Sequence, residues 1–389
     1  MKDINITNSV VYVGCDDKTL DLFESQYHIP NGVSYNSYVI FDEKITIMDT
    51  VDGRVSDEWF KKLDNVLGTK TPDYLVISHL EPDHAANIKK CADKYPNMKL
   101  VGNTKTFSML PLYFDIENLD ERKVVVGEGE KLSLGKRTLT FFMAPMVHWP
   151  EVMVSYDDLD KILFSADAFG KFGALDCDED WACEARRYYF NIVGKYGTQV
   201  QAALKKLSGV DISIICPLHG PILKENLGYY LEKYDIWSSY RAEVDGIFIA
   251  YASIHGNTRN AVYKLKEILE EKTSLKIAIA DVAREDLHEC VEDAFKYSKM
   301  IIASPTYDGA IFSPMDDFLS HLSAKAYQNR KIAIVENGSW APMAGKKIRE
   351  AFEKMKNITI CENTVTLKGA MKDEYVSSLT ALADEIINM

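Results

Sequence analysis

The sequence predicts an α/β protein made of two sheets with covering helices, followed by one parallel, doubly wound sheet. In the first half, short apolar or alternating segments follow one another, with helical segments between and outside them. In the second half, apolar segments alternate with helical ones in five strand–helix units, a pattern that gives parallel strands with right-handed crossovers. The change falls between a helical segment at 229–240 and an apolar segment at 246–252, so the expected domains are 1–243 and 244–389.

The expected elements of the first half are short. One helix is expected at 57–67, where Trp59, Leu63 and Leu67 share a face, and another begins near residue 85. The segments read as strands are 10–13, 37–41, 45–49, 74–77, 100–102, 123–126, 137–142, 161–165 and 212–217.

The second half divides regularly. Its expected strands are 246–252, 275–280, 300–303, 331–335 and 364–367. Its expected helices are 257–272, 286–297, 314–322, 343–355 and 373–387. The absence of a Pro-, Gly- or Ser-rich linker before residue 246 indicates that the two domains are joined tightly.

Composition excludes several classes of function. With 45 basic and 58 acidic residues in 389, the net charge is −13, which disfavours nonspecific nucleic-acid binding. No apolar run approaches membrane-spanning length, and the first residues lack the apolar core of a signal peptide. The seven cysteines form no C-x-x-C pair, so we expect reduced thiols in the cytoplasm and no rubredoxin-type or ferredoxin-type centre in this chain.

A dense cluster of possible metal ligands follows the apolar segment 74–77. His79, Glu81, Asp83 and His84 lie within six residues, in what we expect to be a strand-to-helix loop. Pro82 would block a continuous helix through them and help to fix the loop. So many imidazole and carboxylate groups in one loop indicate a metal site.

Three further candidates also come after apolar runs. His148 follows residues 143–147, Asp167 follows 161–165, and His219 follows 212–217. Each alone is weak evidence, but the shared position at strand ends makes them candidates for the same site.

These residues resemble a known family. His79-x-Glu81-x-Asp83-His84, with His148, Asp167 and His219, resembles the metallo-β-lactamase superfamily, whose hydrolases usually have His where this chain has Glu81. Together with His-Trp-Pro at 148–150, Ser-Ala-Asp-Ala-Phe-Gly at 165–170 and Leu-His-Gly-Pro at 218–221, Glu81 is similar to the flavodiiron branch, also called A-type flavoproteins. The resemblance spans the whole chain. It implies an αββα metallo-β-lactamase-like sandwich followed by a flavodoxin-like domain.

The resemblance also implies a ligand assignment for a bridged diiron centre with two Fe ions per chain. His79, Glu81 and His148 would hold one iron, Asp83, His84 and His219 the other, and Asp167 would bridge them. Each iron then has two imidazoles and one terminal carboxylate, a donor set suited to ferrous iron that reacts with oxygen. Two ferrous ions carry +4 and the three carboxylates −3, so a bridging hydroxide brings the site near neutrality. The charge argument favours iron and leaves zinc and manganese open.

The loops of the second half suggest a flavin site. The loop 253–258 is neither G-x-G-x-x-G nor a Walker A motif, but its hydroxyls and the N–H groups at a helix N-terminus suit a phosphate. Tyr307 and Trp340, in the loops after the third and fourth strands, could flank a flat ring. The pattern resembles flavodoxin, which implies FMN. The candidate FMN-binding residues are Ser253, His255, Gly256, Asn257, Thr258, Pro305, Thr306, Tyr307, Asp308, Gly309, Asn337, Gly338, Ser339 and Trp340.

The family implies an oxidoreductase that reduces O2 to water with four electrons, NO to N2O, or both. It also implies a separate rubredoxin as electron donor, reduced by an NADH-dependent reductase, and a head-to-tail homodimer or a dimer of dimers. Two alternatives remain open: a zinc-dependent hydrolase fused to a flavodoxin-like domain, and an electron carrier whose first domain is a metal-free scaffold. The sequence does not separate O2 from NO, although family resemblance slightly favours O2.

Overall fold

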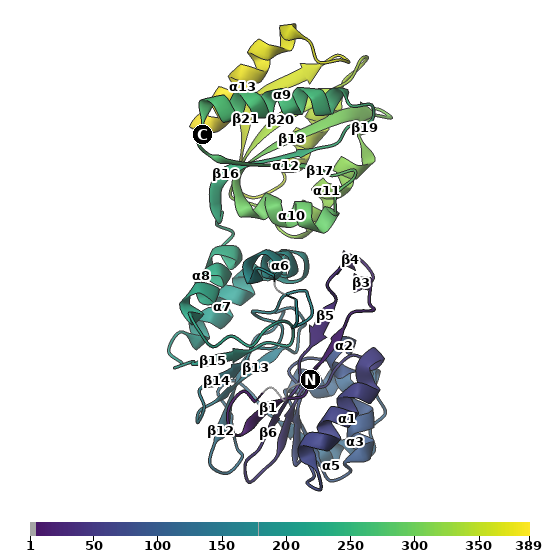
Figure 1. Ribbon diagram of the computed structural model, residues 1–389, viewed down its shortest axis with the longest axis vertical. Coiled ribbons are helices and arrows are strands. Elements are labelled where there is room, and N and C mark those ends of the chain that lie inside the picture. Colours follow the sequence, from purple (N-terminus) through teal and green to yellow (C-terminus); the bar gives the residue numbers. More distant parts are fainter. Residues whose placement is uncertain (1–4, 178) are drawn as a thin grey trace. The chain divides into compact units, whose positions relative to one another are not determined.

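The computed structural model describes residues 5–177 and 179–389 (Figure 1). Contacts within the chain divide it into two compact units. The first unit comprises Met1–Tyr189 and Tyr196–Asp235, and the second unit comprises Phe190–Lys195 and Ile236–Met389. The boundary after residue 243 stays a prediction, because contacts already group Ile236 onward with the second unit. No helix among the described residues is long and apolar enough to cross a bilayer.

The first unit contains two large sheets. The six-stranded sheet has the order β1 (Val10–Tyr12), β6 (Tyr38–Ile40), β7 (Thr46–Met48), β8 (Tyr74–Val76), β9 (Lys99–Gly102) and β10 (Lys123–Val125). The five-stranded sheet has the order β11 (Lys131–Ser133), β12 (Thr138–Met143), β13 (Met153–Asp157), β14 (Ile162–Phe164) and β15 (Ile214–Cys216). β7 to β10 are parallel, as are β14 and β15, and the other pairs are antiparallel.

The two sheets enclose the core of the first unit. Side chains from both sheets form one buried cluster, in which Tyr38 and Met48 of the first sheet meet Phe141 and Phe164 of the second. Tyr38 and Phe164 are in edge-on contact, with ring centroids 5.5 Å apart. Burial of this apolar surface is the main stabilising term for such a sandwich.

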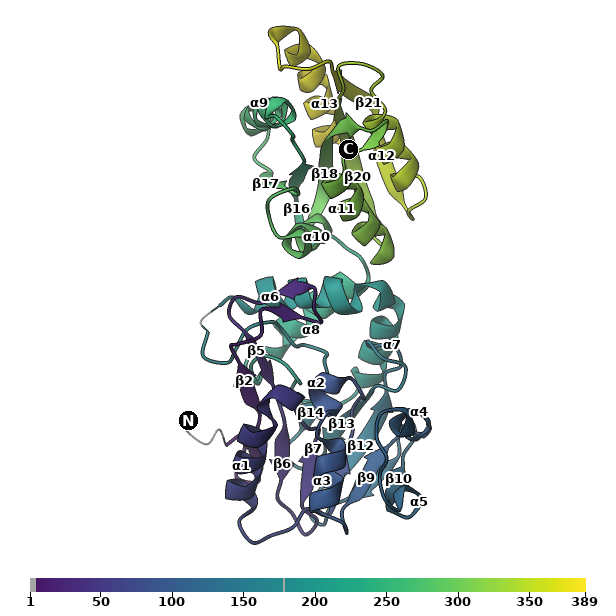
Figure 2. The same cartoon turned by 90° about the vertical axis from the view of Figure 1, so that its right-hand side faces the viewer.

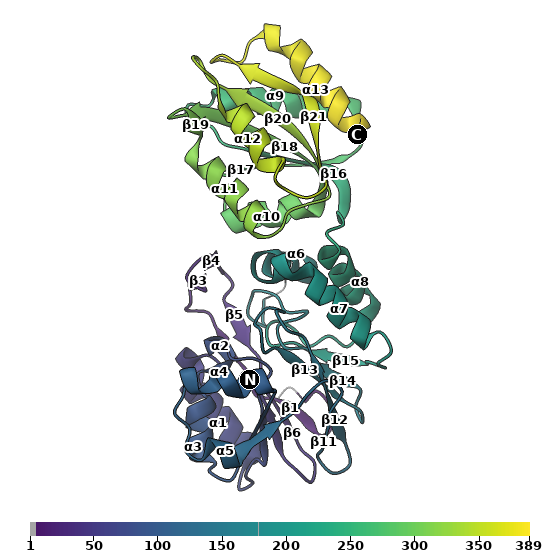
Figure 3. The same ribbon diagram turned by 180° about the vertical axis from the view of Figure 1, so that it is seen from behind.

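Helices cover the sheets of the first unit. Those beside the six-stranded sheet are α1 (Ser56–Leu67), α3 (Ile88–Lys94), α4 (Thr104–Met109) and α5 (Leu119–Arg122) (Figure 2). α7 (Gly197–Leu207) contacts β12 of the five-stranded sheet. In α6 (Trp181–Tyr188), the ring of Trp181 lies edge-on to Tyr230 of α8 (Leu227–Ser238). α7 and α8 lie side by side (Figure 3), and Gln201 donates a hydrogen bond to Asp235. Short pairs, β2 (Cys15–Asp17) with β5 (Val33–Tyr35) and β3 (Leu22–Phe23) with β4 (Tyr27–His28), complete this unit.

The second unit confirms the predicted parallel, doubly wound sheet. Its strands have the order β17 (Lys276–Asp281), β16 (Val244–Tyr251), β18 (Tyr297–Tyr307), β20 (Arg330–Asn337) and β21 (Ile358–Leu367), all parallel. α9 (Asn257–Lys272) and α13 (Val376–Asn388) share one core cluster with these strands. α10 (Leu287–Lys296), α11 (Ser313–Ala324) and α12 (Ala344–Phe352) belong to the opposite side.

Two local expectations were wrong. Residues 82–85 form a short helix, α2 (Pro82–Ala85), instead of a loop. Proline is favoured at the first helical position, where its missing N–H would have no partner in any case, so Pro82 starts this helix. In addition, β18 continues to Tyr307 and pairs with β19 (Ala310–Ile311), so the predicted loop 305–309 begins as a hairpin strand.

Candidate functional site

The structure brings all seven predicted metal ligands together in the first unit. His79 lies beyond the end of β8, and α2 carries Asp83 and His84. Glu81 directly precedes α2, and the remaining positions are His148 in the turn between β12 and β13, Asp167 after β14 and His219 after β15. Loops at the ends of rigid strands can bring together side chains that are distant in sequence, and these loops do so.

One group of side chains surrounds Glu81. Nε2 of His148 lies 2.9 Å from Oε2 of Glu81 and 3.2 Å from Oδ2 of Asp167. Nε2 of His79 lies 3.2 Å from the same Asp167 oxygen and 3.9 Å from Oε2 of Glu81. Four side chains therefore direct their polar atoms into one small volume.

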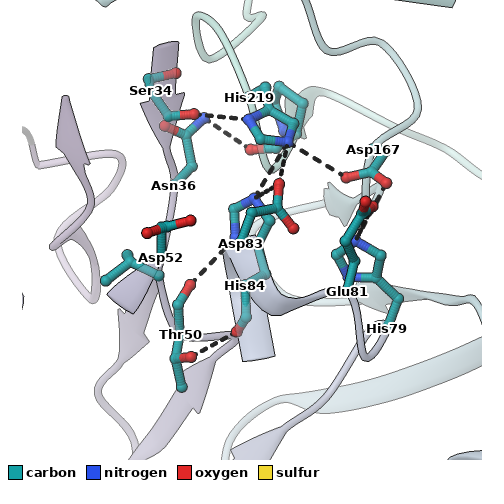
Figure 4. A network of polar contacts seen from close by, with 12 residues as sticks. Ser34, Asn36, Thr50, Asp52, His79, Glu81, Asp83, His84, Asp167 and His219 are labelled. Carbon is teal, nitrogen blue, oxygen red and sulfur yellow. Dashed lines mark hydrogen bonds and ion pairs between the residues drawn. The ribbon is translucent and has the colours of Figure 1, made fainter. Parts of the chain in front are cut away.

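A second group surrounds Asp83. Its Oδ2 lies 3.1 Å from Nε2 of His219 and 3.7 Å from Nε2 of His84, and these two nitrogens are 3.3 Å apart. The other oxygen of Asp167, Oδ1, lies 3.8 Å from Nε2 of His219. Asp167 thus presents one oxygen to each group (Figure 4).

Several polar atoms of the site are buried and lack hydrogen-bond partners. Both ring nitrogens of His79, both carboxylate oxygens of Asp83 and Asp167, and Nε2 of His148 are in this state within the described chain. His79 and Asp167 are completely shielded from solvent. Buried polar atoms without partners are costly unless something else satisfies them. Two cations among these atoms would do so, and the donor set therefore fits a pair of metal ions.

Backbone carbonyls orient two of the imidazoles. Nδ1 of His219 donates to the carbonyl of Ser34 at 2.8 Å, and Nδ1 of His84 donates to that of Thr50 at 3.2 Å. A carbonyl only accepts, so the proton resides on Nδ1 and the lone pair on Nε2 faces the site. This is how proteins present a histidine to a metal.

The electrostatics of the site also suit cations. Burial disfavours the imidazolium and lowers the pKa of His84 to about 3, so this ring is neutral, the form that binds metals. Burial raises the pKa of Glu81 to about 7, and the neighbouring Asp83 carboxylate adds to this effect. For His79, burial opposes the charged form, but Asp167 outweighs it and raises the pKa to about 10. Protons held on Glu81 and His79 therefore neutralise part of the carboxylate charge. Bound metal ions would take the place of these protons.

Three residues that sequence reasoning missed hold the loops in place. Asp49 accepts hydrogen bonds from the backbone N–H of Ser78 at 2.7 Å and from its hydroxyl at 2.6 Å. Glu151 accepts from the N–H of Leu80 at 2.7 Å, and so joins the His148 turn to the His79 loop. Asn36 donates to two carbonyls on either side of His219, those of Pro217 and Gly220. Nothing in the local sequence of these residues distinguishes them from ordinary buried polar side chains.

A cavity of about 160 Å³ borders the site, and we call it the polar cavity after its charged side chains, although Leu20, Leu22 and Phe23 also line it. Glu81 and Asp83 line it together with Glu24, Asp52 and Arg54. Glu24, also missed from the sequence, is exposed and lies within metal-binding distance of Glu81 and His148. Water and protons can therefore reach the Glu81–Asp83 side of the site.

The predicted phosphate loop of the second unit is built around Ser253. Its hydroxyl accepts from the N–H groups of Gly256 at 3.1 Å and Arg259 at 3.3 Å, which bends the loop into the start of α9. Gly256 has φ of +87°, a left-handed conformation that glycine adopts without strain. The first N–H groups of a helix have no intrahelical acceptor, and Thr258 is buried beside them.

Two of the other predicted flavin residues are held by neighbouring loops. The hydroxyl of Thr306 accepts from the N–H groups of Met343 and Ala344, at 2.9 and 3.0 Å. Asn337 makes a reciprocal pair with the backbone of Gly369, a loop that the sequence analysis did not include. These two residues shape the strand ends.

Aromatic rings are exposed at the same edge. The side chain of Tyr307 is 49% exposed and that of Trp340 is 84% exposed. Among the remaining candidates, His255, Asp308, Gly309 and Ser339 are exposed, Asn257 and Gly338 are half-buried, and Pro305 is buried.

Comparisons with known proteins agree with this architecture. Residues 33–220 match the sequence model of the ODP family of β-lactamase-like domains. The chain is 26% identical over 393 residues to a nitric oxide reductase of Moorella thermoacetica, covering 98% of each protein. It superposes on rubredoxin oxygen:oxidoreductase from Desulfovibrio gigas with a TM-score of 0.92 and 26% identity, covering 100% of this chain and 98% of the other. It shares its fold with a flavodiiron protein from Giardia intestinalis, with a TM-score of 0.92 and 24% identity, covering 99% and 96%.

Proposed function

We infer from its similarity to flavodiiron proteins that this chain belongs to the flavodiiron family, and we propose that it reduces O2 to water, NO to N2O, or both. The reaction would take place at two iron ions held in the first unit, and FMN held by the second unit would supply electrons. One observation carries the proposal: seven buried or half-buried side chains converge, with buried polar atoms of His79, Asp83, His148 and Asp167 left without hydrogen-bond partners. Asp167 faces both groups.

The ligand assignment follows the two groups. His79, Glu81 and His148 would hold one iron, and Asp83, His84 and His219 the other, with Asp167 shared between them. Two imidazoles and a terminal carboxylate at each position suit ferrous iron. Two ferrous ions and reduced FMN together supply the four electrons that convert O2 to two waters, and two of these electrons suffice to convert two NO into N2O and water.

The polar cavity supports the supply of protons. O2 reduction consumes four protons and NO coupling consumes two, and these must come from solvent. At the cavity wall, a guanidinium nitrogen of Arg54 lies 3.3 Å from Oδ2 of Asp52. The side chain of Arg54 is largely exposed, and that of Asp52 is mostly buried. The cavity would deliver protons from solvent toward the Glu81–Asp83 side and release product water there.

The second unit would bind FMN at the carboxyl ends of its strands. The phosphate would lie at the N-terminus of α9, where unsatisfied N–H groups and the helix dipole favour an anion. Exposed faces of Tyr307 and Trp340 are available for the flavin ring.

Electrons would come from a separate rubredoxin, with an NADH-dependent reductase upstream. The similar D. gigas protein is a rubredoxin oxygen:oxidoreductase, which supports this donor. We further propose a head-to-tail homodimer, in which the FMN of one chain serves the iron pair of the other. A cytoplasmic location agrees with the absence of disulfides among the described residues.

The proposal is tested by anaerobic reduction with rubredoxin, followed by separate measurements of O2 and NO consumption. We expect about two irons and one FMN per chain and rapid consumption of at least one gas. Protein made with iron available that instead contains two zinc ions per chain and turns over lactams or thioesters would overturn the proposal. Electron transfer through FMN without consumption of either gas would do so as well.

A further inference from the structure

A second, apolar cavity lies in the first unit beneath the metal-binding loops. β13 and β14 supply Val154 and Leu163 to its wall, and α7 supplies Val200 and Ala203. The cavity has about 20 Å³ of room for the centre of a water-sized sphere. A cavity that only just fitted one such sphere would leave its centre almost no room, so the space holds one small molecule.

The wall offers no hydrogen bond to a guest. Only two of its side chains carry polar atoms, and both are engaged elsewhere. The hydroxyl of Ser165 donates to the carbonyl of Ala168 at 2.7 Å, and that of Tyr234 accepts from the N–H of Phe169 at 2.5 Å. A water molecule needs two to four polar partners, so water is excluded and an apolar guest is favoured.

The wall of the cavity includes chain neighbours of two predicted metal ligands. Val147 and Ala168 form part of its wall, and each is the direct chain neighbour of a predicted ligand, His148 or Asp167. The polar cavity, in contrast, reaches Glu81 and Asp83. One cavity therefore contains charged side chains and two of the predicted ligands, and the other is almost wholly apolar and contains chain neighbours of two further ligands.

The outer end of the apolar cavity approaches the surface. Ala203 and Leu204 of α7 line it and are only half-buried. A small neutral gas prefers an apolar cavity to water, because its transfer requires no lost hydrogen bond. The half-buried part of the wall on α7 is therefore the side from which a gas would enter the cavity.

We propose that this cavity binds one neutral diatomic gas molecule, O2 or NO, and delivers it past Val147 and Ala168 to the metal centre. The identity of the gas rests on the proposed function, whereas the existence of an apolar gas site does not. Protons and water would use the polar cavity, and the gas would use the apolar one.

The first test is the binding of xenon, an apolar probe that needs neither metal nor turnover. We expect one xenon atom per chain at this cavity, detected in xenon-pressurised crystals of the full chain or by ¹²⁹Xe NMR. Ala203→Leu should fill the cavity and abolish this signal. Ala202→Leu, the same change at the neighbouring exposed position of α7, should leave it intact. If Ala203→Leu fails to fold, Val154→Ile takes its place, because it adds one methylene group to a side chain in the cavity wall.

The second test is steady-state consumption of the gas by the iron- and FMN-loaded protein. Ala203→Leu should lower kcat/KM for the gas and leave kcat at saturating gas unchanged, relative to Ala202→Leu. Absence of xenon from the wild type, or equal kcat/KM in the two variants, would overturn the inference. Xenon binding in a loaded protein that consumes neither gas would preserve the cavity as an apolar gas site but contradict the proposed function.

Discussion

Replacement of Glu81 by Gln tests whether the negative charge of this side chain is what retains a metal ion. The amide keeps the size of the side chain and one oxygen, so the variant removes charge with little change in packing. Oε2 of Glu81 lies 2.9 Å from His148 and 3.9 Å from His79, at the centre of one ligand group. The variant should therefore lose the metal ion at only one of the two proposed iron positions.

The magnitude follows from Coulomb's law. A unit negative charge about 4 Å from a divalent cation contributes about 8 kcal/mol at an effective dielectric constant of about 20. Since about 1.4 kcal/mol corresponds to a factor of ten, the dissociation constant of that ion should rise by about five to six orders of magnitude. The matched control is Glu24→Gln, because Glu24 belongs to the same group but is exposed. Solvent screens exposed charges, so its effect should be far smaller.

The assay is metal content per chain after dialysis against chelators of increasing strength, with flavin absorbance measured on the same samples. The expected result for Glu81→Gln is one iron per chain, reductase activity largely lost and FMN fully retained. Retention of two irons with wild-type affinity would show that the charge argument is wrong. Loss of FMN with intact iron would contradict the assignment of the two cofactors to the two units.

Three other outcomes are expected. Thr258→Val removes a hydroxyl at the start of α9 and should weaken the binding of FMN by about 1.5–3 kcal/mol, the range for a hydrogen bond to a charged group. Dialysis should then remove flavin but not iron, and equal loss of both would count against the FMN site. Removal of the metal ions should lower the free energy of unfolding of the first unit by about 4 kcal/mol, compared with protein in which one ion is present at a thousandfold excess over its dissociation constant. Calorimetry measures this difference, and an unchanged unfolding transition would argue against metal binding in the first unit. Leu265→Ala truncates a completely buried side chain of α9 and should destabilise the second unit by about 2–5 kcal/mol in denaturant titrations; a shift in the first unit instead would refute the core assignment.

Long periodic segments were predictable from the sequence. The helix expected at 57–67 is α1 (Ser56–Leu67), because the buried side chains of Trp59, Leu63 and Leu67 recur at helical spacing. The five strand–helix units of the second half are present, because strands buried on both faces read as unbroken apolar runs. The seven proposed ligands could be singled out because imidazoles and carboxylates at strand ends are chemically conspicuous.

The supporting contacts were not predictable. Glu151 accepts a hydrogen bond from Leu80, 71 positions earlier, and Asn36 binds carbonyls 181 and 184 positions later. No local sequence pattern predicts a contact between residues so far apart along the chain. β13 (Met153–Asp157) was missed because Ser155 and Asp157 are polar yet buried, so its sequence shows neither an unbroken apolar run nor alternation. The engagement of Thr306 with the start of α12 was hidden because its hydroxyl suits a ligand equally well.

The second unit is not one continuous stretch of chain. Phe190–Lys195, which lies between two segments of the first unit in the sequence, belongs to it. Phe190 stacks on Phe295, with ring centroids 4.1 Å apart and planes 13° from parallel.

This interruption constrains the order in which a newly made chain can fold. Domains generally fold as units during synthesis, starting from the N-terminal one. The first unit is fully synthesised at Asp235, but the stack of Phe190 on Phe295 must wait until the ribosome has passed α10. A gene fragment that begins at Ile236 would omit Phe190–Lys195 and leave Phe295 uncovered on that face. Attempts to produce the second unit alone should therefore add this six-residue piece back or replace the ring it covers.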